Sequence, residues 1–139
     1  MSSIVQTQTT SFKKELYQGI HDLSTDTIKI SLYTAAADLN QATTVYSSTN
    51  EVVASGYTAG GQVMTGVTIS SDGYTAYVNW ANVSWTTAVT ARCALIYNVT
   101  QGNKSIAVLD FGSDKTSTTT FLITMPANTS TAALIRSSN

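Results

Sequence analysis

Charged side chains are scarce in this chain. Only 11% of its 139 residues are Asp, Glu, Lys or Arg, and the formal net charge is −1, whereas about a quarter of a typical soluble domain is charged. Nucleic-acid binding needs clustered basic residues to neutralise phosphates, and Lys13–Lys14 is the one adjacent basic pair. We therefore expect no nucleic-acid partner. Disorder is equally disfavoured, because it combines low hydrophobicity with high net charge and 42% of the residues are apolar.

Cysteine and histidine occur once each. Cys93 can form no internal disulfide, and it falls on the apolar side of a predicted strand, where a free Cys acts as a small hydrophobe. His21 stands beside Asp22, which raises the hypothesis of a general base oriented by a carboxylate. With no second His and no nucleophile nearby in sequence, we interpret it as a polar loop residue. Cys93 and His21 cannot supply a zinc ligand quartet. We predict no catalytic, metal-binding or cofactor-binding residue.

Long apolar runs are also lacking, and no segment is long enough to span a membrane. The first residues have neither the basic region nor the apolar core of a signal peptide. We expect a protein that is made and folded in the cytoplasm.

Alternating apolar and polar residues are present, and they are clearest in residues 90–125. Ala91, Cys93, Leu95 and Tyr97 alternate with their neighbours, which is typical of a strand with two unlike faces. A turn at 100–103 leads into a second strand at 105–111. After a turn at 112–115, a third strand is predicted at 119–125. These segments predict three successive antiparallel strands.

The rest of the chain adds one helix and more strands. Phe12, Leu16 and Ile20 recur at helical spacing, so a short helix is predicted at 12–18, with Ser11 as its N-cap and Gly19 at its end. Residues 1–11 form a polar arm that is either frayed or extended onto a neighbour. Further strands are expected at 28–32, at 63–69 and 74–80 around a hairpin turn, and at 133–136. Residues 12–139 then form one domain.

Strands every ten or so residues, with turn signals between them, predict a mainly β fold. We expect an antiparallel β-sandwich or barrel, jelly-roll or Ig-like, with one short N-terminal α-helix. The connection at 34–61 is long for a compact domain, which indicates a functional segment or one involved in contacts. Gly60–Gly61 within it lacks the Lys and Ser or Thr of a phosphate loop.

Aromatic residues leave one alternative open. Trp80 and Trp85 are interpreted as core residues, but an exposed Trp85 with tyrosines on one sheet face would suit a carbohydrate-binding module. A structure with both tryptophans buried would exclude that platform. The tyrosines are scattered over the predicted strands, namely Tyr46, Tyr57, Tyr74, Tyr77 and Tyr97. Asp110 and Asp114 flank a predicted turn and are interpreted as turn residues, so an enzyme is not expected.

Several short blocks, in this order, resemble a group of small structural proteins of tailed bacteriophages. They are FKKELYQGIHD at 12–22, LYT at 32–34, GYTAGG at 56–61, ALIYN at 94–98 and VLDFG at 108–112. The resemblance spans residues 12–136 and implies a non-enzymatic virion component with no site residue to carry over.

Within that group, we expect a capsid decoration or cement protein that stabilises the head through subunit–subunit contacts. A neck, tail or fibre-associated component is the alternative. The expected location is the virion, after synthesis in the host cytoplasm. The expected partners are other virion proteins, either the major capsid protein or neck and tail proteins. Homo-oligomers are common among such subunits, and a trimer is favoured.

Overall fold

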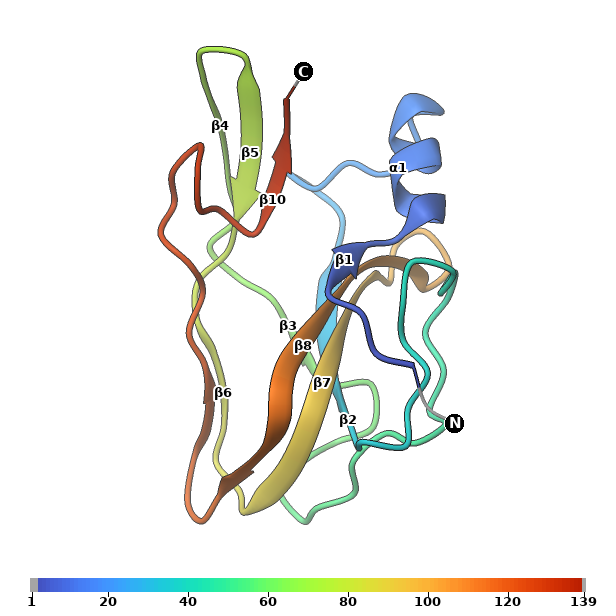
Figure 1. The fold of residues 1–139 in the computed structure, drawn as a ribbon, viewed down its shortest axis with the longest axis vertical. Helices are drawn as coiled ribbons and strands as arrows, with labels where there is room; N and C mark the ends of the chain where they lie inside the picture. Colours follow the sequence, from blue (N-terminus) through green and yellow to red (C-terminus); the bar gives the residue numbers. More distant parts are fainter. Residues whose placement is uncertain (1–2, 139) are drawn as a thin grey trace.

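The computed structural model describes residues 3–138 and is mainly β, with every strand pair antiparallel (Figure 1). The largest sheet has the strand order β1-β8-β7-β2-β3. Strands β6 and β9 form a second, two-stranded sheet, and β10-β5-β4 form a third. The predicted antiparallel, sandwich-like β fold with one short helix is confirmed.

The element bounds are β1 (Thr7–Gln8), α1 (Thr10–Tyr17), β2 (Ile28–Tyr33), β3 (Gln62–Val63), β4 (Thr68–Asp72), β5 (Thr75–Asn79), β6 (Val83–Trp85), β7 (Val89–Asn98), β8 (Lys104–Ser117), β9 (Phe121–Ile123) and β10 (Ile135–Ser137).

The β7–β8 hairpin is the centre of the large sheet, as its alternating residues predict, but β7 does not have one polar face. Ala94 and Ile96 belong to the main apolar cluster, whereas Cys93, Leu95 and Tyr97 belong to a second cluster on the other face. The second face is covered by the connection after β2, through Ala37 and Leu39, and by Ile4 of the N-terminal arm. Both faces of β7 are therefore buried.

Two of the expected elements after residue 111 differ in the structure. The turn expected at 112–115 is instead an irregularity within β8. Asp110 pairs with Cys93 and Lys115 pairs with Ala91, so residues 111–114 have no ladder partner on β7. The third strand is shorter than expected and does not pair with β8: β9 pairs with β6 in the other layer. The last short strand exists as β10, which pairs with β5.

The helix begins earlier than predicted. Its N-cap is Thr9, whose Oγ1 accepts a hydrogen bond from Phe12 N at 3.3 Å, so the prediction of Ser11 as the cap is wrong. Thr9 takes this role because its own N–H bonds to Ile106 O at 2.9 Å, which places the chain on β8 just before the helix. Phe12 is the buried anchor, whereas Leu16 is exposed.

The described part of the N-terminal arm is neither frayed nor extended away from the domain. Val5 N donates to Leu39 O at 3.0 Å, and Leu39 N donates to Ser3 O at 2.9 Å. Thr7 and Gln8 then pair with Val108 and Ala107 of β8. The described arm is therefore held on this chain by backbone hydrogen bonds to the edge of β8 and to Leu39. Met1 and Ser2, also assigned to the arm, lie outside the described residues.

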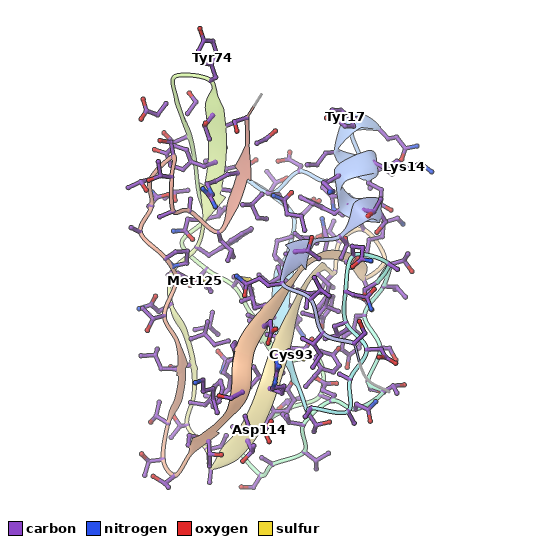
Figure 2. All side chains as sticks on the ribbon, viewed as in Figure 1. Lys14, Tyr17, Tyr74, Cys93, Asp114 and Met125 are labelled. Atoms are coloured by element: carbon purple, nitrogen blue, oxygen red, sulfur yellow. The ribbon has the colours of Figure 1, made fainter. Side chains whose placement is uncertain are left out.

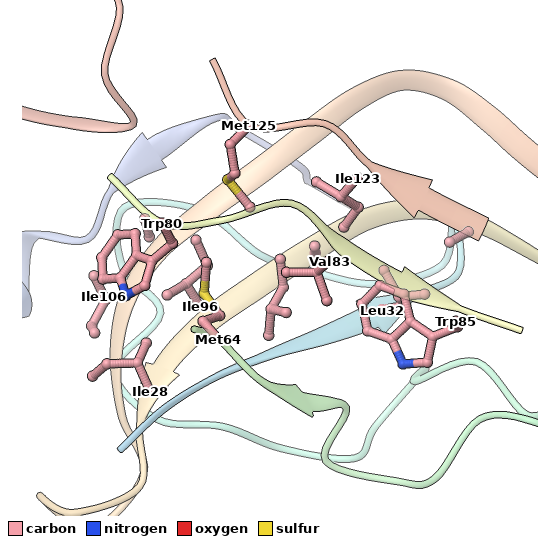
Figure 3. Close-up of a cluster of buried hydrophobic side chains, with 14 of the residues drawn as sticks. Ile28, Leu32, Met64, Trp80, Val83, Trp85, Ile96, Ile106, Ile123 and Met125 are labelled. Carbon is pink, nitrogen blue, oxygen red and sulfur yellow. The ribbon is translucent and has the colours of Figure 1, made fainter. Parts of the chain in front are cut away.

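The main core lies between the large sheet and the β6–β9 layer (Figure 3). The rings of Trp85 and Phe121 form a T-shaped pair at a centroid distance of 6.3 Å, and the ring of Tyr57 lies 6.0 Å from that of Trp85. Trp80 and Ile106 are near the other end of the same cluster. The interpretation of both tryptophans as core residues is confirmed.

Candidate functional site

His21 lies in a buried polar cluster and not beside a reactive surface. Its Nε2 is 2.9 Å from Glu15 Oε1, and its side chain is 0% exposed. Asn98 Nδ2 donates to His21 Nδ1 at 3.0 Å and to Asp26 Oδ2 at 2.8 Å. Since Nδ1 accepts, Nε2 carries the proton that is donated to Glu15. The cluster connects α1 to the end of β7, and no substrate can reach the ring.

Cys93 and the two aspartates form no reactive site either. Cys93 is fully buried, and burial raises the pKa of its thiol to about 12, so little thiolate forms at neutral pH. Asp110 pairs with Arg92, whereas Asp114 is exposed further along β8. Among residues 3–138 there is no group of three or more His, Cys, Asp or Glu that could hold a metal ion.

The tryptophans offer no stacking platform. Trp80 is 5% exposed and Trp85 is 2% exposed, so the proposed carbohydrate site at Trp85 is excluded. Tyr74 is exposed at the tip of the β4–β5 hairpin, and Tyr17 is exposed at the end of the helix (Figure 2). Isolated rings of this kind do not form the coplanar surface that sugar stacking requires.

Sequence reasoning missed a buried carboxylate in the long connection. Glu51 Oε1 accepts a hydrogen bond from Tyr46 Oη, and Oε2 accepts from Tyr57 Oη and from Gly60 N at 2.8 Å. Tyr97 Oη of β7 donates to Gly60 O at 2.6 Å. Burial raises the pKa of the Tyr46 and Tyr57 phenols, and their hydrogen bonds to Glu51 raise it further.

The Glu51 cluster fixes the 34–61 connection to β2 and β7. Tyr57 Oη also accepts from Leu32 N at 2.9 Å, and the ring of Tyr46 stacks on that of Tyr97 at 4.7 Å. The expectation that this long connection is involved in contacts is met within the chain itself. The one hint in the sequence was that tyrosines stand on both sides of Glu51, at Tyr46 and Tyr57. Nothing in the pattern predicted that these side chains would contact one another.

The candidate functional site is a groove of about 630 Å³ between the outer edge of β8 and the segment that contains β9. Gln6 and Lys115 contribute polar groups at its walls. Its apolar lining consists of Leu109, Phe111, Phe121, Leu122, Ile123, Met125, Pro126 and Leu134. We call this feature the β8–β9 groove. Its volume is within the range of small-molecule and peptide sites.

Unpaired strand edges border this groove. β1 pairs with β8 only at Ala107 and Val108, so in the described chain β8 has no strand partner on its outer side from Leu109 onward. β9 pairs only with β6. The two layers of the sandwich are thus not joined on this side. An apolar groove beside free backbone N–H and C=O groups can accept an extended segment as an added strand.

Comparison with known proteins gives no relative for this chain: no family model, no curated protein and no solved structure matches it.

Proposed function

We propose that this chain is a non-enzymatic structural protein of a tailed-bacteriophage virion, and that it decorates the capsid and stabilises the head by binding the major capsid protein. The observation that supports a binding role most is the β8–β9 groove, an open apolar groove bordered by unpaired strand edges. The phage context comes from the sequence resemblance.

The groove suits an extended segment of a partner protein. An extended segment in the groove would place its apolar side chains against Phe111, Phe121 and Met125. It would form backbone hydrogen bonds with the free edge of β9. Each fully buried aliphatic or aromatic side chain contributes about 1.5–3 kcal/mol before ordering costs. Repeated over many copies on a lattice, such contacts are sufficient to reinforce a shell.

The lack of an exposed reactive side chain and the low charge of the chain agree with this role. The three side chains that first suggested chemistry, His21, Cys93 and Asp110, are buried or paired. The low charge of the chain also suits a protein partner better than a nucleic acid. A neck, tail or fibre-associated component would bind its partner through the same groove. It would differ from a decoration protein in the number of copies per particle.

Co-sedimentation with assembled capsids tests the proposal. Leu122 is 57% exposed and lines the groove, so Leu122→Asp should weaken binding tenfold or more without unfolding the chain. Val53 is exposed and lies outside the groove, so Val53→Asp is the matched control and should bind like the unmodified chain.

Two results would contradict the proposal as stated: no binding of the unmodified chain to assembled capsids, or equal binding by the two variants. The first result argues against capsid binding altogether. The second leaves capsid binding in place but removes the groove as its site.

A further inference from the structure

β4 is an edge strand whose five residues are all exposed. It pairs with β5 on one side and, among the described residues, with no strand on the other. β4, β5 and β10 extend beyond the large sheet at one end of the molecule (Figure 1). A small sheet of this kind presents a free row of backbone donors and acceptors.

The hairpin turn determines which backbone groups are free. Gly73 and Tyr74 form a two-residue loop, and the positive φ of +59° at Gly73 suits the first position of a type II′ turn. In such a hairpin the flanking residues, Asp72 and Thr75, form a hydrogen-bonded pair. Because the pairs alternate, the N–H and C=O groups of Ile69 and Ser71 point away from β5.

One face of the three-stranded sheet is uncharged. Ile69, Val78 and Ile135 lie side by side across the three strands. Val78 and Ile135 reach the main core, but Ile69 is 53% exposed. The next row on this face consists of Ser71, Ala76 and Ser137.

The chain's own 126–132 segment binds residues of the opposite face. Asp72 Oδ2 accepts from Ser130 Oγ at 3.2 Å, and Arg136 donates to Thr131 O at 2.6 Å. In this sheet, the outer edge of β4 and the exposed Ile69 on the uncharged face are therefore not covered by the 126–132 segment.

The two long free edges of the chain differ in their protection. On the outer edge of β8, Gln6 Oε1 accepts from Asp110 N at 3.0 Å, and charged Asp114 and Lys115 follow. Charged residues and local capping of this kind discourage pairing with another chain. From Thr68 to Ser71, β4 has no charge, no proline and no bulge.

We propose that β4 pairs antiparallel with β4 of a second copy of this chain, about a two-fold axis that passes beside Ser70. In this register Ile69 is opposite Ser71 of the second copy, Thr68 is opposite Asp72, and Ser70 is opposite itself. No like charges are opposed, and the free groups of Ile69 and Ser71 form roughly four backbone hydrogen bonds across the axis. The product is a dimer with a continuous six-stranded sheet.

The pairing is self-complementary, and this is why a second copy is the occupant. Asp72, the only charged residue of β4, is opposite a threonine hydroxyl, and the two Ile69 side chains are diagonal neighbours on the uncharged face. The inference does not depend on a virion role, since it concerns the isolated chain in solution.

Disulfide trapping tests the register. Ser70 would form a non-hydrogen-bonded pair across the axis, with Cα atoms about 4.5 Å apart, which is within disulfide range. In the full chain, Ser70→Cys should form a covalent dimer on mild oxidation. Ser113→Cys, at an exposed serine of β8, is the matched control and should stay monomeric on a denaturing gel. The native Cys93 is buried and does not interfere.

Light scattering coupled to size exclusion gives the second measurement. The unmodified chain should show a concentration-dependent dimer. Ser71→Pro removes an N–H group that points away from β5, so the β4–β5 hydrogen bonds stay intact. Ile69→Lys places the two ammonium groups of the dimer near each other. Each variant should weaken dimerisation tenfold or more. Val63→Lys, at an exposed valine of β3, is the control and should dimerise normally. Thermal melts identify any variant that fails to fold.

The inference is overturned by a monomer at every concentration, by a trimer, or by a dimer that Ile69→Lys leaves intact. A covalent dimer of Ser113→Cys without one of Ser70→Cys overturns it as well and moves the interface to β8.

Discussion

The Tyr46 phenol donates a hydrogen bond of 2.5 Å to Oε1 of Glu51, a carboxylate that is almost fully buried. Glu51 in turn holds Tyr57 and Gly60. A buried carboxylate is costly unless its oxygens are hydrogen-bonded, and here three donors satisfy them. The 34–61 connection is consequently a fixed part of the fold.

Removing one phenol of this cluster should destabilise the chain. Tyr57→Phe leaves Leu32 N–H without its acceptor and Glu51 with one donor fewer, so the free energy of unfolding should fall by about 1–3 kcal/mol. Urea unfolding measures this. Tyr17→Phe, at a tyrosine that is 93% exposed, is the control and should change stability by less than about 0.5 kcal/mol. Equal effects of the two substitutions would mean that the cluster contributes nothing.

Alkaline pH should unfold the chain. Burial raises the pKa of four phenols above the ordinary 10.0, that of Tyr97 to about 12, and raises the pKa of the Cys93 thiol from 9.0 to about 12. Below pH 9 both states hold these protons, so stability is unaffected. Above that, the unfolded chain loses protons first, and stability falls as pH rises toward the folded-state pKa values. Urea midpoints from pH 8 to 11.5 measure the decline; a constant midpoint over this range contradicts the prediction.

Gly61 should tolerate no side chain. Its φ is +81°, and a Cβ atom would lie 1.8 Å from Ile30 O, so Gly61→Ala should disrupt the β2–β3 pairing and lower the melting temperature sharply. Gly102→Ala is the matched control, because Gly102 has a similar φ of +72° and open space around it; it should cost only about 1 kcal/mol of backbone strain. Similar melting temperatures for the two variants would contradict the close approach to β2.

Asn98 should be important for stability although it performs no chemistry. Its buried side chain joins His21 and Asp26, so Asn98→Ala should lower the free energy of unfolding by about 1–3 kcal/mol, because the buried His21 and the half-buried Asp26 each lose a donor. Asn128→Ala, at an exposed position, should have little effect. A stability unchanged by Asn98→Ala would show that the His21 cluster is satisfied in another way.

The parts of the fold that the sequence predicted are those governed by local rules. β2 and the hairpin turn before β5 follow from alternation and from Asp72–Gly73, which needs no distant information. The single strand expected at 63–69 is wrong, because β3 and β4 belong to different sheets and Gly66, with a φ of +65°, lies between them. The pairing of β9 with β6 places Trp85 opposite Phe121 on two strands far apart in the sequence, and the helix cap depends on Thr9 binding Ile106 O. Such long-range contacts leave no periodic signal.

The same limit applies to the site. The pattern predicts Leu109 and Phe111 as ordinary strand residues. They line a groove only because β1 begins at the Thr7–Val108 pair and leaves the rest of β8 uncovered, and because β9 belongs to the other layer. Likewise, no pattern around Glu51 indicated its burial, since the tyrosines that bind it come from separate segments.

The most direct test of the virion role is the protein content of purified particles. The proposed role implies a phage that encodes this chain, and quantitative mass spectrometry of washed particles of that phage would give the copy number of the chain relative to the major capsid protein. A decoration protein should be present in many copies, in a fixed ratio to the capsid lattice. A chain that is abundant in the lysate but missing from washed particles would contradict the role.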